Sequence, residues 1–411
     1  MKYHLHYIKL LLLMFCIGGA VSACKDYDDE KKESDKPELT IFIHQPYSGL
    51  ESYLDHDLQE VNKALRNNPE ICKKINILYF RNNYITGKLY KKNYHIDPTT
   101  GEESIEDVLL KEYPLSQTDY TTFSGLHQIL SDVVSIGKTD KYGMVIGCHG
   151  SGWIPTKEDK SSRAASGDKV IRKVFGKIDN DTYNATYKTL GKAIEATGKK
   201  MEFILVDDCY SQNIEVAYDL RNASNFLIAS ITEMGGDGQD YETAIPHLLE
   251  GNYKAICDYN KDYYTQVGNP WKTSTISITD CSQVESMVSI MKEIYSSANL
   301  NDVDRDALQV FDGYDCEYGY NIFYDFSQYV HLLCNDAPLL AKFDAQMKKL
   351  IVYNVFTPEF NSVFFDYGAH HKIPDHNYLR PITTCCGITC SDPCTERQND
   401  WKETSWYKAT H

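Results

Sequence analysis

Short apolar runs alternate along this chain with longer segments in which apolar residues recur every three or four positions, and this alternation limits the possible folds most strongly. Runs rich in β-branched and aromatic residues predict strands, whereas the three-to-four-residue period predicts amphipathic helices. The predicted strands are 39–44, 75–80, 142–148, 201–206 and 225–230. The predicted helices are 53–65, 123–136, 186–197 and 211–222. Because strands and helices that alternate form β-α-β units, we expect an α/β fold with a mostly parallel sheet flanked by helices.

The other segments are less regular and set the expected domain limits. Residues 81–113 are polar and rich in Tyr and Lys, which predicts a long loop or hairpin, and residues 154–185 predict a loop. Beyond residue 270 the pattern predicts helices at 284–297, 324–333 and 339–355, and strands at 362–367 and 384–390. We therefore expect a core over residues 38–270 and a C-terminal subdomain over residues 271–411 that packs on it.

The first residues have the features of a secretory signal. Lys2 and Lys9 give a positive start, and a short apolar run from Ile8 to Ile17 follows. The segment ends in Val21-Ser22-Ala23-Cys24, which resembles the lipobox of bacterial lipoproteins. The resemblance implies that residues 1–23 are removed and that Cys24 is acylated, and several acyl chains anchor a protein firmly. The alternative is an ordinary cleaved signal.

The segment after Cys24 is polar and acidic, so residues 24–37 are predicted to be a flexible tether. Acidic residues at this place resemble the surface-export signal of Bacteroidetes lipoproteins. That resemblance implies a lipid-anchored protein of the outer membrane or cell surface, and it leaves the leaflet open. The whole chain carries a formal charge of −16, which argues against nucleic acid as the main partner.

Two residues suited to thiol chemistry follow predicted strands. His149 comes after 142–148 and Cys209 after 201–206, and the carboxyl ends of parallel strands meet at one edge of a sheet. A thiol nucleophile needs a base and donors for the developing oxyanion. We expect Cys209 to be the nucleophile, His149 the base, and the amides of Gly150 and Cys209 the oxyanion donors. A helix start after Cys209 is expected to favour its thiolate.

The motifs around His149 and Cys209 indicate a function more specifically than the presence of one His and one Cys does. Residues 148–153 read Cys-His-Gly-Ser-Gly-Trp, and residues 207–209 read Asp-Asp-Cys. Together with Glu-Val-Ala-Tyr at 215–218 and Gly-Asp-Gly at 236–238, these motifs resemble the clostripain family, the C11 peptidases of clan CD. The resemblance covers roughly residues 110–270. It implies a caspase-like α/β fold and an endopeptidase that cleaves after Arg or Lys through a Cys–His dyad.

A cationic substrate side chain needs buried acidic groups in the site that binds it. The resemblance assigns this role to Asp207, two residues before the nucleophile, and to Asp237 in the Gly-Asp-Gly motif. Asp208 is expected to point to the opposite face as a charge near a helix start. The usual family sequence E-P-G-D-G-W is replaced here by residues 233–239, which lack the Pro and the Trp, so the choice between Arg and Lys stays open.

The resemblance also implies activation by autolysis between the His and Cys motifs. The 154–185 loop contains several basic residues, of which Arg163 followed by Ala164 is the preferred cleavage site, because small residues flank it. A basic loop that is never cut is the alternative.

No metal site is predicted. The four cysteines between 385 and 394 lack C-x2-C spacing, and the histidines at 370–376 lack a helical pair, so neither group indicates zinc. Disulfides or buried free thiols are the expected state of the cysteines. Some family members are activated by calcium, which leaves a calcium requirement open.

We expect a monomer that acts on protein or peptide substrates. One alternative is a catalytically silent binding lipoprotein displayed on the surface. A second, a glycan-handling lipoprotein, lacks an identifiable pair of carboxylates.

Overall fold

A computed structural model describes most of the chain, in which residues Pro37–His411 form one compact unit. The described residues are 36–46, 50–83, 85–114, 116–156, 171–172, 185–298, 303–312, 321–361, 379–394 and 397–411. The predicted signal 1–23, Cys24 and the predicted cleavage site at Arg163 and Ala164 lie outside these residues.

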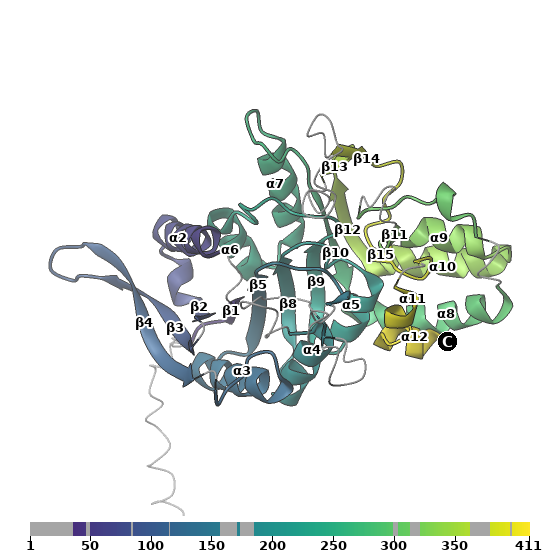
Figure 1. Cartoon of the computed structure of the whole chain (residues 1–411). Coiled ribbons are helices and arrows are strands. Elements are labelled where there is room, and N and C mark those ends of the chain that lie inside the picture. The colour runs from purple at the N-terminus through teal and green to yellow at the C-terminus, as the bar shows by residue number, and fades with distance from the viewer. Residues whose placement is uncertain are drawn as a thin grey trace, which may run out of the picture. The chain divides into compact units, whose positions relative to one another are not determined.

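A nine-stranded sheet forms the centre of the molecule (Figure 1). In spatial order its strands are β12 (Ile351–Phe356), β10 (Thr275–Asp280), β9 (Ser224–Ser230), β8 (Met201–Asp207), β5 (Lys141–Gly147), β1 (Leu39–Gln45), β2 (Ile75–Asn82), β3 (Thr86–Ile96) and β4 (Glu103–Pro114). The five strands from β9 to β2 are parallel, and antiparallel strands extend both edges. This arrangement confirms the predicted α/β fold with a mostly parallel sheet.

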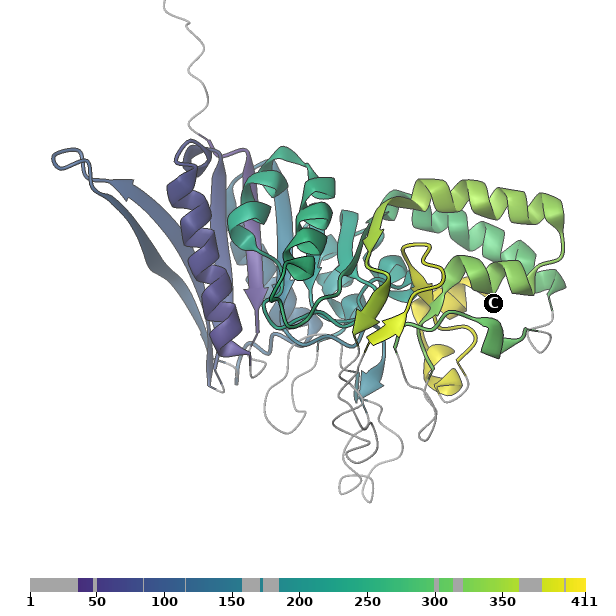
Figure 2. The same cartoon turned by 90° about the horizontal axis from the view of Figure 1, so that it is seen from above.

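Helices cover both faces of the sheet, as Figure 2 shows in a view from above. On one face lie α2 (Glu51–Asn67), α6 (Tyr241–Glu250) and α7 (Tyr253–Thr265); on the other lie α3 (Phe123–Gly137), α4 (Tyr187–Ala196) and α5 (Ile214–Leu220). Strand side chains alternate between two hydrophobic clusters, so Phe203 and Leu205 face the first layer while Ile204 and Val206 face the second. A strand buried on both faces therefore appears in the sequence as a continuous apolar run.

The segments outside the regular pattern deviate most from expectation. Most of residues 81–113 belong to a long hairpin of β3 and β4, and a hairpin was one of the two predicted alternatives. The helix predicted over 339–355 is wrong at its end, because α10 (Ala337–Leu350) stops and β12 follows directly. Residues 351–356 read Ile-Val-Tyr-Asn-Val-Phe, and such β-branched and aromatic side chains favour a strand when a sheet edge is available.

The C-terminal region adds strands to the same sheet and a helical layer beside it. Strands β10 and β12 both follow residue 270 and pair with the core through β9. The additional helices are α8 (Val284–Ser297), α9 (Phe326–Leu333), α11 (Gln398–Trp401) and α12 (Ser405–Thr410). Short pairs are formed by β11 (Tyr324–Asp325) with β15 (Thr389–Cys390), by β13 (Glu359–Asn361) with β14 (Leu379–Pro381), and by β6 (Pro155–Thr156) with β7 (Ile171–Arg172).

A buried carboxyl group on α5 connects this C-terminal region to the core. Oε1 of Glu215 accepts hydrogen bonds from the Ser391 amide (2.9 Å) and from Nε1 of Trp401 (3.0 Å). Neither Oε2 of Glu215 nor either carboxyl oxygen of the buried Asp392 has a hydrogen-bond partner in the described part of the chain. Burial, the largest effect, raises the pKa of Glu215 to about 7. The neutral form of Glu215 is therefore favoured by folding.

We expect Glu215→Gln to stabilise the protein above neutral pH. Because the folded pKa exceeds the unfolded one, the wild type loses stability as pH rises from about 4.5 to about 7. Gln keeps the acceptor and cannot ionise, so its gain in unfolding free energy should be about 2–3 kcal/mol larger at pH 8 than at pH 5. Chemical denaturation at both pH values measures the difference. The exposed Glu195→Gln on α4 is the control, and an equal effect at both pH values would contradict the expectation.

Candidate active site

Cys209 and His149 follow neighbouring parallel strands at equivalent positions. Strands β5 and β8 pair with Gly147 opposite Asp207, and each of the two residues lies two positions further along its chain. Adjacent strands are about 4.8 Å apart, so this register makes the backbones of His149 and Cys209 neighbours at the carboxyl edge of the sheet. His149 is exposed and Cys209 is half-buried.

The two loops are in direct contact beyond the strand ends. A Cβ atom built on Gly150 would overlap the carboxyl group of Asp208, so only glycine allows the His149 loop to approach the Cys209 loop this closely. Gly152 has φ of +58°, and a Cβ there would lie 2.6 Å from the carbonyl oxygen of Tyr210. Both glycines of the sequence motif are thus required by the packing of one loop against the other.

The surroundings of Cys209 favour the neutral thiol in this structure. Its Sγ accepts a weak hydrogen bond from the Met234 amide (3.5 Å). Burial has the largest effect, and the charge of Glu233 adds to it, so the pKa of Cys209 is raised well above its ordinary value. The expected thiolate stabilisation by a helix start is wrong, because α5 begins only at Ile214, with Asn213 as its N-cap. Four residues, 210–213, lie between Cys209 and the first residue of that helix.

Asp207 is buried under α6. Its Oδ2 accepts hydrogen bonds from the hydroxyl of Tyr241 (2.7 Å) and the amide of Gln239 (3.1 Å). Its Oδ1 is buried and has no hydrogen-bond partner in the described part of the chain. Burial raises the pKa of Asp207 above its ordinary value, and the two hydrogen bonds partly oppose this effect. Asp207 therefore has one carboxyl oxygen available for a further donor.

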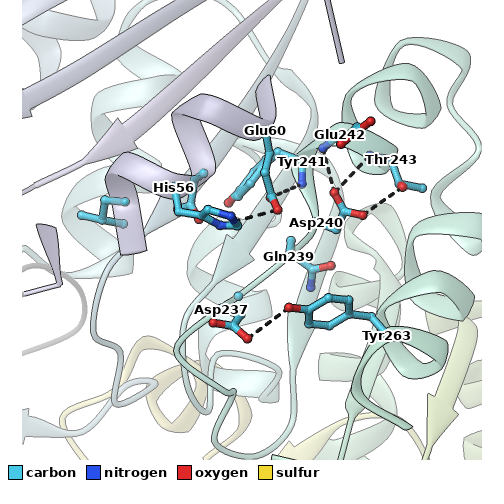
Figure 3. A network of polar contacts seen from close by, with 12 residues as sticks. His56, Glu60, Asp237, Gln239, Asp240, Tyr241, Glu242, Thr243 and Tyr263 are labelled. Carbon is cyan, nitrogen blue, oxygen red and sulfur yellow. Dashed lines mark hydrogen bonds and ion pairs between the residues drawn. The ribbon is translucent and has the colours of Figure 1, made fainter. Parts of the chain in front are cut away.

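Asp237 lies in the turn that leads to α6 and is exposed. Its carboxyl group accepts a hydrogen bond from the Tyr263 hydroxyl (3.1 Å), as Figure 3 shows. The neighbouring Tyr264 donates to the carbonyl oxygen of Gly238 (2.8 Å) and fixes the turn. Gly238 itself packs against Asp207, since a Cβ there would lie 2.6 Å from Oδ2. Of the two predicted acids, Asp207 therefore lies in the interior beside this turn, and Asp237 lies in the turn at the surface.

Asp208 does point away from Asp207, but it is not a charge at a helix start. Its carboxyl group is buried and accepts hydrogen bonds from the hydroxyls of Tyr187 (3.0 Å), at the start of α4, and of Ser211. Burial raises its pKa well above the ordinary value. Asp208 therefore connects the Cys209 loop to α4 and also forms the surface against which Gly150 packs.

One C-terminal segment, residues 389–391, contacts both loops, and no pattern in the sequence indicates these contacts. Trp153, four residues after His149, donates from Nε1 to the Ser391 hydroxyl (2.8 Å). The Ser391 amide donates to Glu215 on α5, and the Thr389 amide donates to the carbonyl oxygen of Gln212 (3.1 Å). Residues so far apart in sequence share no pattern that could have revealed these contacts.

Metal-binding groups are few. In the described residues, the one group whose ligand atoms lie within 4.8 Å of one another is His56, Asp57 and Glu60 on α2. Glu60 also accepts a hydrogen bond from the Tyr241 amide (3.0 Å), and His56 Nδ1 lies 3.5 Å from Glu60 (Figure 3). The ten described cysteines are all free thiols, and those between 385 and 394 are not part of such a group.

Comparisons with known proteins identify the family. The model of the clostripain family, peptidase C11, matches residues 46–388. A secreted C11 cysteine protease from Bacteroides thetaiotaomicron, "iotapain", is 32% identical, with 92% of this chain and 99% of that chain covered and a TM-score of 0.76. An inactive zymogen C11 protease from Parabacteroides distasonis is 22% identical, with 92% and 99% covered and a TM-score of 0.70.

A clostripain from Bacteroides thetaiotaomicron ATCC 29148, in complex with the peptide inhibitor BTN-VLTK-AOMK, is 34% identical. The match covers 58% of this chain and 99% of that chain, with a TM-score of 0.50. No curated protein matched the chain. The extent of the family match and the identity to iotapain, together with the caspase-like sheet, show that this chain belongs to the clostripain family of C11 cysteine proteases.

Proposed function

We propose that the protein is a cysteine endopeptidase in which Cys209 is the nucleophile and His149 the proton carrier. The register of β5 and β8 supports this assignment most strongly, because it brings both residues to one edge of the sheet. His149 would take the thiol proton while the sulfur attacks the substrate carbonyl carbon. The amides of Gly150 and Cys209 would stabilise the oxyanion, and His149 would then protonate the leaving amine. Water would hydrolyse the acyl-enzyme.

We further propose that the substrate residue before the cleaved bond, P1, is Arg or Lys. Asp207 supports this, because its buried Oδ1 lacks a hydrogen-bond partner in the described residues and would suit a cationic donor. The peptide inhibitor in the complex of the 34% identical clostripain is BTN-VLTK-AOMK, in which Lys directly precedes AOMK. A cationic P1 side chain would also offset the negative charges of Glu233 and Asp207 that raise the pKa of Cys209. Substrate binding would therefore favour proton transfer to His149.

We expect Cys209→Ala to abolish hydrolysis of fluorogenic peptides with Arg or Lys at P1, lowering kcat at least a thousandfold, because the substitution removes the sulfur atom proposed to attack the substrate. The half-buried Cys72→Ala serves as the control and should keep wild-type rates. Activity that survives in Cys209→Ala would disprove the nucleophile assignment. A wild-type protein that turns over no peptide, even after proteolytic cutting, would favour the silent binding protein instead.

Activation by autolysis is proposed at the bond between Arg163 and Ala164. This bond lies in sequence between β6 and β7, and these two strands pair antiparallel. The P1 preference proposed above matches the Arg residue, so the enzyme could cut its own chain there.

Arg163→Ala is therefore expected to prevent the conversion of the purified chain into two fragments, which a denaturing gel detects. Lys169→Ala, in the same part of the sequence, is the matched control and should be cut like the wild type. If Arg163→Ala gave the same two fragments as the wild type, this bond would not be the cleavage site.

A lipid anchor at Cys24 is proposed from the lipobox-like sequence at residues 21–24. In the described part of the chain, no helix is both long and apolar enough to cross a membrane. We propose that acyl chains on Cys24 attach the protein to the outer membrane or the cell surface.

Cys24→Ala should abolish incorporation of an alkyne-labelled fatty acid in a bacterial host that processes lipoproteins. Cys16→Ala, inside the apolar run of the signal, is expected to leave labelling unchanged. Equal labelling of the Cys24→Ala variant and the wild type would place the acyl group elsewhere.

A further inference from the structure

We propose that Asp57 on α2 is a second buried acid that recognises the cationic P1 side chain, opposite Asp207. This inference rests on the function proposed above and adds a specificity-determining residue that lies far from both sequence motifs. Asp57 lies near the middle of a helix, 150 residues before Asp207 (207 − 57). Its position is determined by the sheet.

Three neighbouring strands bring the relevant groups together. His44 on β1 is opposite Ile146 on β5, which places Gln45 beside Gly147, and Gly147 is opposite Asp207 on β8. In-register residues on adjacent strands point to the same face, here the face covered by α2 and α6. Because Gly147 has no side chain, no side chain separates the amide of Gln45 from the carboxyl group of Asp207 within this row.

Gln45 holds Asp57 above this row. Its Nε2 donates to Oδ2 of Asp57 (3.2 Å) and lies 3.4 Å from the carbonyl oxygen of Leu54. A Cβ built on Gly147 would lie 3.3 Å from Leu54 and 3.5 Å from Gln45, so α2 packs directly over this glycine. Asp57 is therefore fixed at the same edge of the sheet as Asp207.

Tyr241 on α6 forms a second connection between Asp207 and the acidic residues of α2. Its hydroxyl donates to Asp207 (2.7 Å), and its amide donates to Glu60 (3.0 Å), which lies one helical turn after Asp57. Figure 3 shows the contact between Glu60 and Tyr241, where α2 meets the start of α6. The carboxyl groups of Asp57, Glu60 and Asp207 thus surround one place between α2 and α6.

The charges at this place do not balance. Burial, and then the charges of Asp207 and Glu60, raise the pKa of Asp57, whereas Arg81 on β2 opposes them. Arg81 itself forms an ion pair with the exposed Asp55. Asp57 and Asp207 are only 5% and 8% exposed, and buried carboxylates are costly unless a cation accompanies them. A guanidinium or ammonium group between Asp57 and Asp207 would supply the missing positive charge.

Two carboxyl groups from different elements suit a planar guanidinium better than a point charge, because its donors diverge in a fixed fork. The arrangement therefore predicts a preference for Arg over Lys. This preference would depend on α2, whereas the nucleophile and its base lie on the loops after β5 and β8.

The test uses peptides that differ only at P1, with Arg or with its uncharged analogue citrulline. Asp57→Asn keeps the shape and removes the charge, so the ratio of kcat/KM for Arg over citrulline should fall about tenfold to a hundredfold. The loss should appear in KM for the Arg peptide, and citrulline turnover should stay at the wild-type rate. Asp55→Asn, an exposed acid on the same helix, is the matched control and should leave the ratio unchanged.

Thermal melting verifies that each variant folds, and Asp57→Ser replaces Asp57→Asn if the latter does not. An Arg-to-citrulline ratio within about twofold of the wild type would overturn the role of Asp57. Equal losses for both peptides would do the same, because they would indicate a structural effect without charge recognition. Neither outcome affects the nucleophile assignment, which Cys209→Ala tests separately.

Discussion

The in-register pairing of β5 with β8 is the interaction on which the rest of this structure depends. It makes the loops after Gly147 and Asp207 neighbours although some sixty residues separate them in sequence. Every group assigned to chemistry or to substrate recognition is placed relative to this pair: the thiol and imidazole beyond its end, and the buried acid at its last residue. A shift of one residue would move each side chain to the opposite face of the sheet.

Excess negative charge distinguishes the region around the thiol. Asp207 and Asp208, on opposite faces, and Glu233 beside Cys209 all lie in buried or nearly buried surroundings. Such burial lowers the stability of the free protein, and proteins accept this cost mainly where a ligand gains from it. The same charges favour the protonated thiol. Under the proposed function a cationic P1 side chain would offset them, so substrate recognition and thiol activation would both follow from the same group of acidic residues.

Much of the core, and the position of His149 and Cys209 at one edge of the sheet, could be predicted from the sequence. Apolar runs such as 201–206 form strands because both faces are buried, and the motifs around His149 and Cys209 are local in sequence. The end of α10 was misjudged, because local periodicity does not reveal that a sheet edge is available to residues 351–356. Contacts of Ser391 and Asp57 could not be predicted, since they join residues that are distant in sequence and follow no spacing rule.

The strand order has a consequence for a chain broken between β5 and β8. The strands of the central sheet that precede the break, β1 to β5, occupy one half of it, and β8, β9, β10 and β12 occupy the other. The boundary between the two pieces would then run along the middle of the sheet, with the imidazole on one piece and the sulfur on the other. Backbone pairing between β5 and β8 and the shared apolar layers would still hold the two pieces together. The proposed reactive centre would then lie at the interface of a stable two-chain molecule.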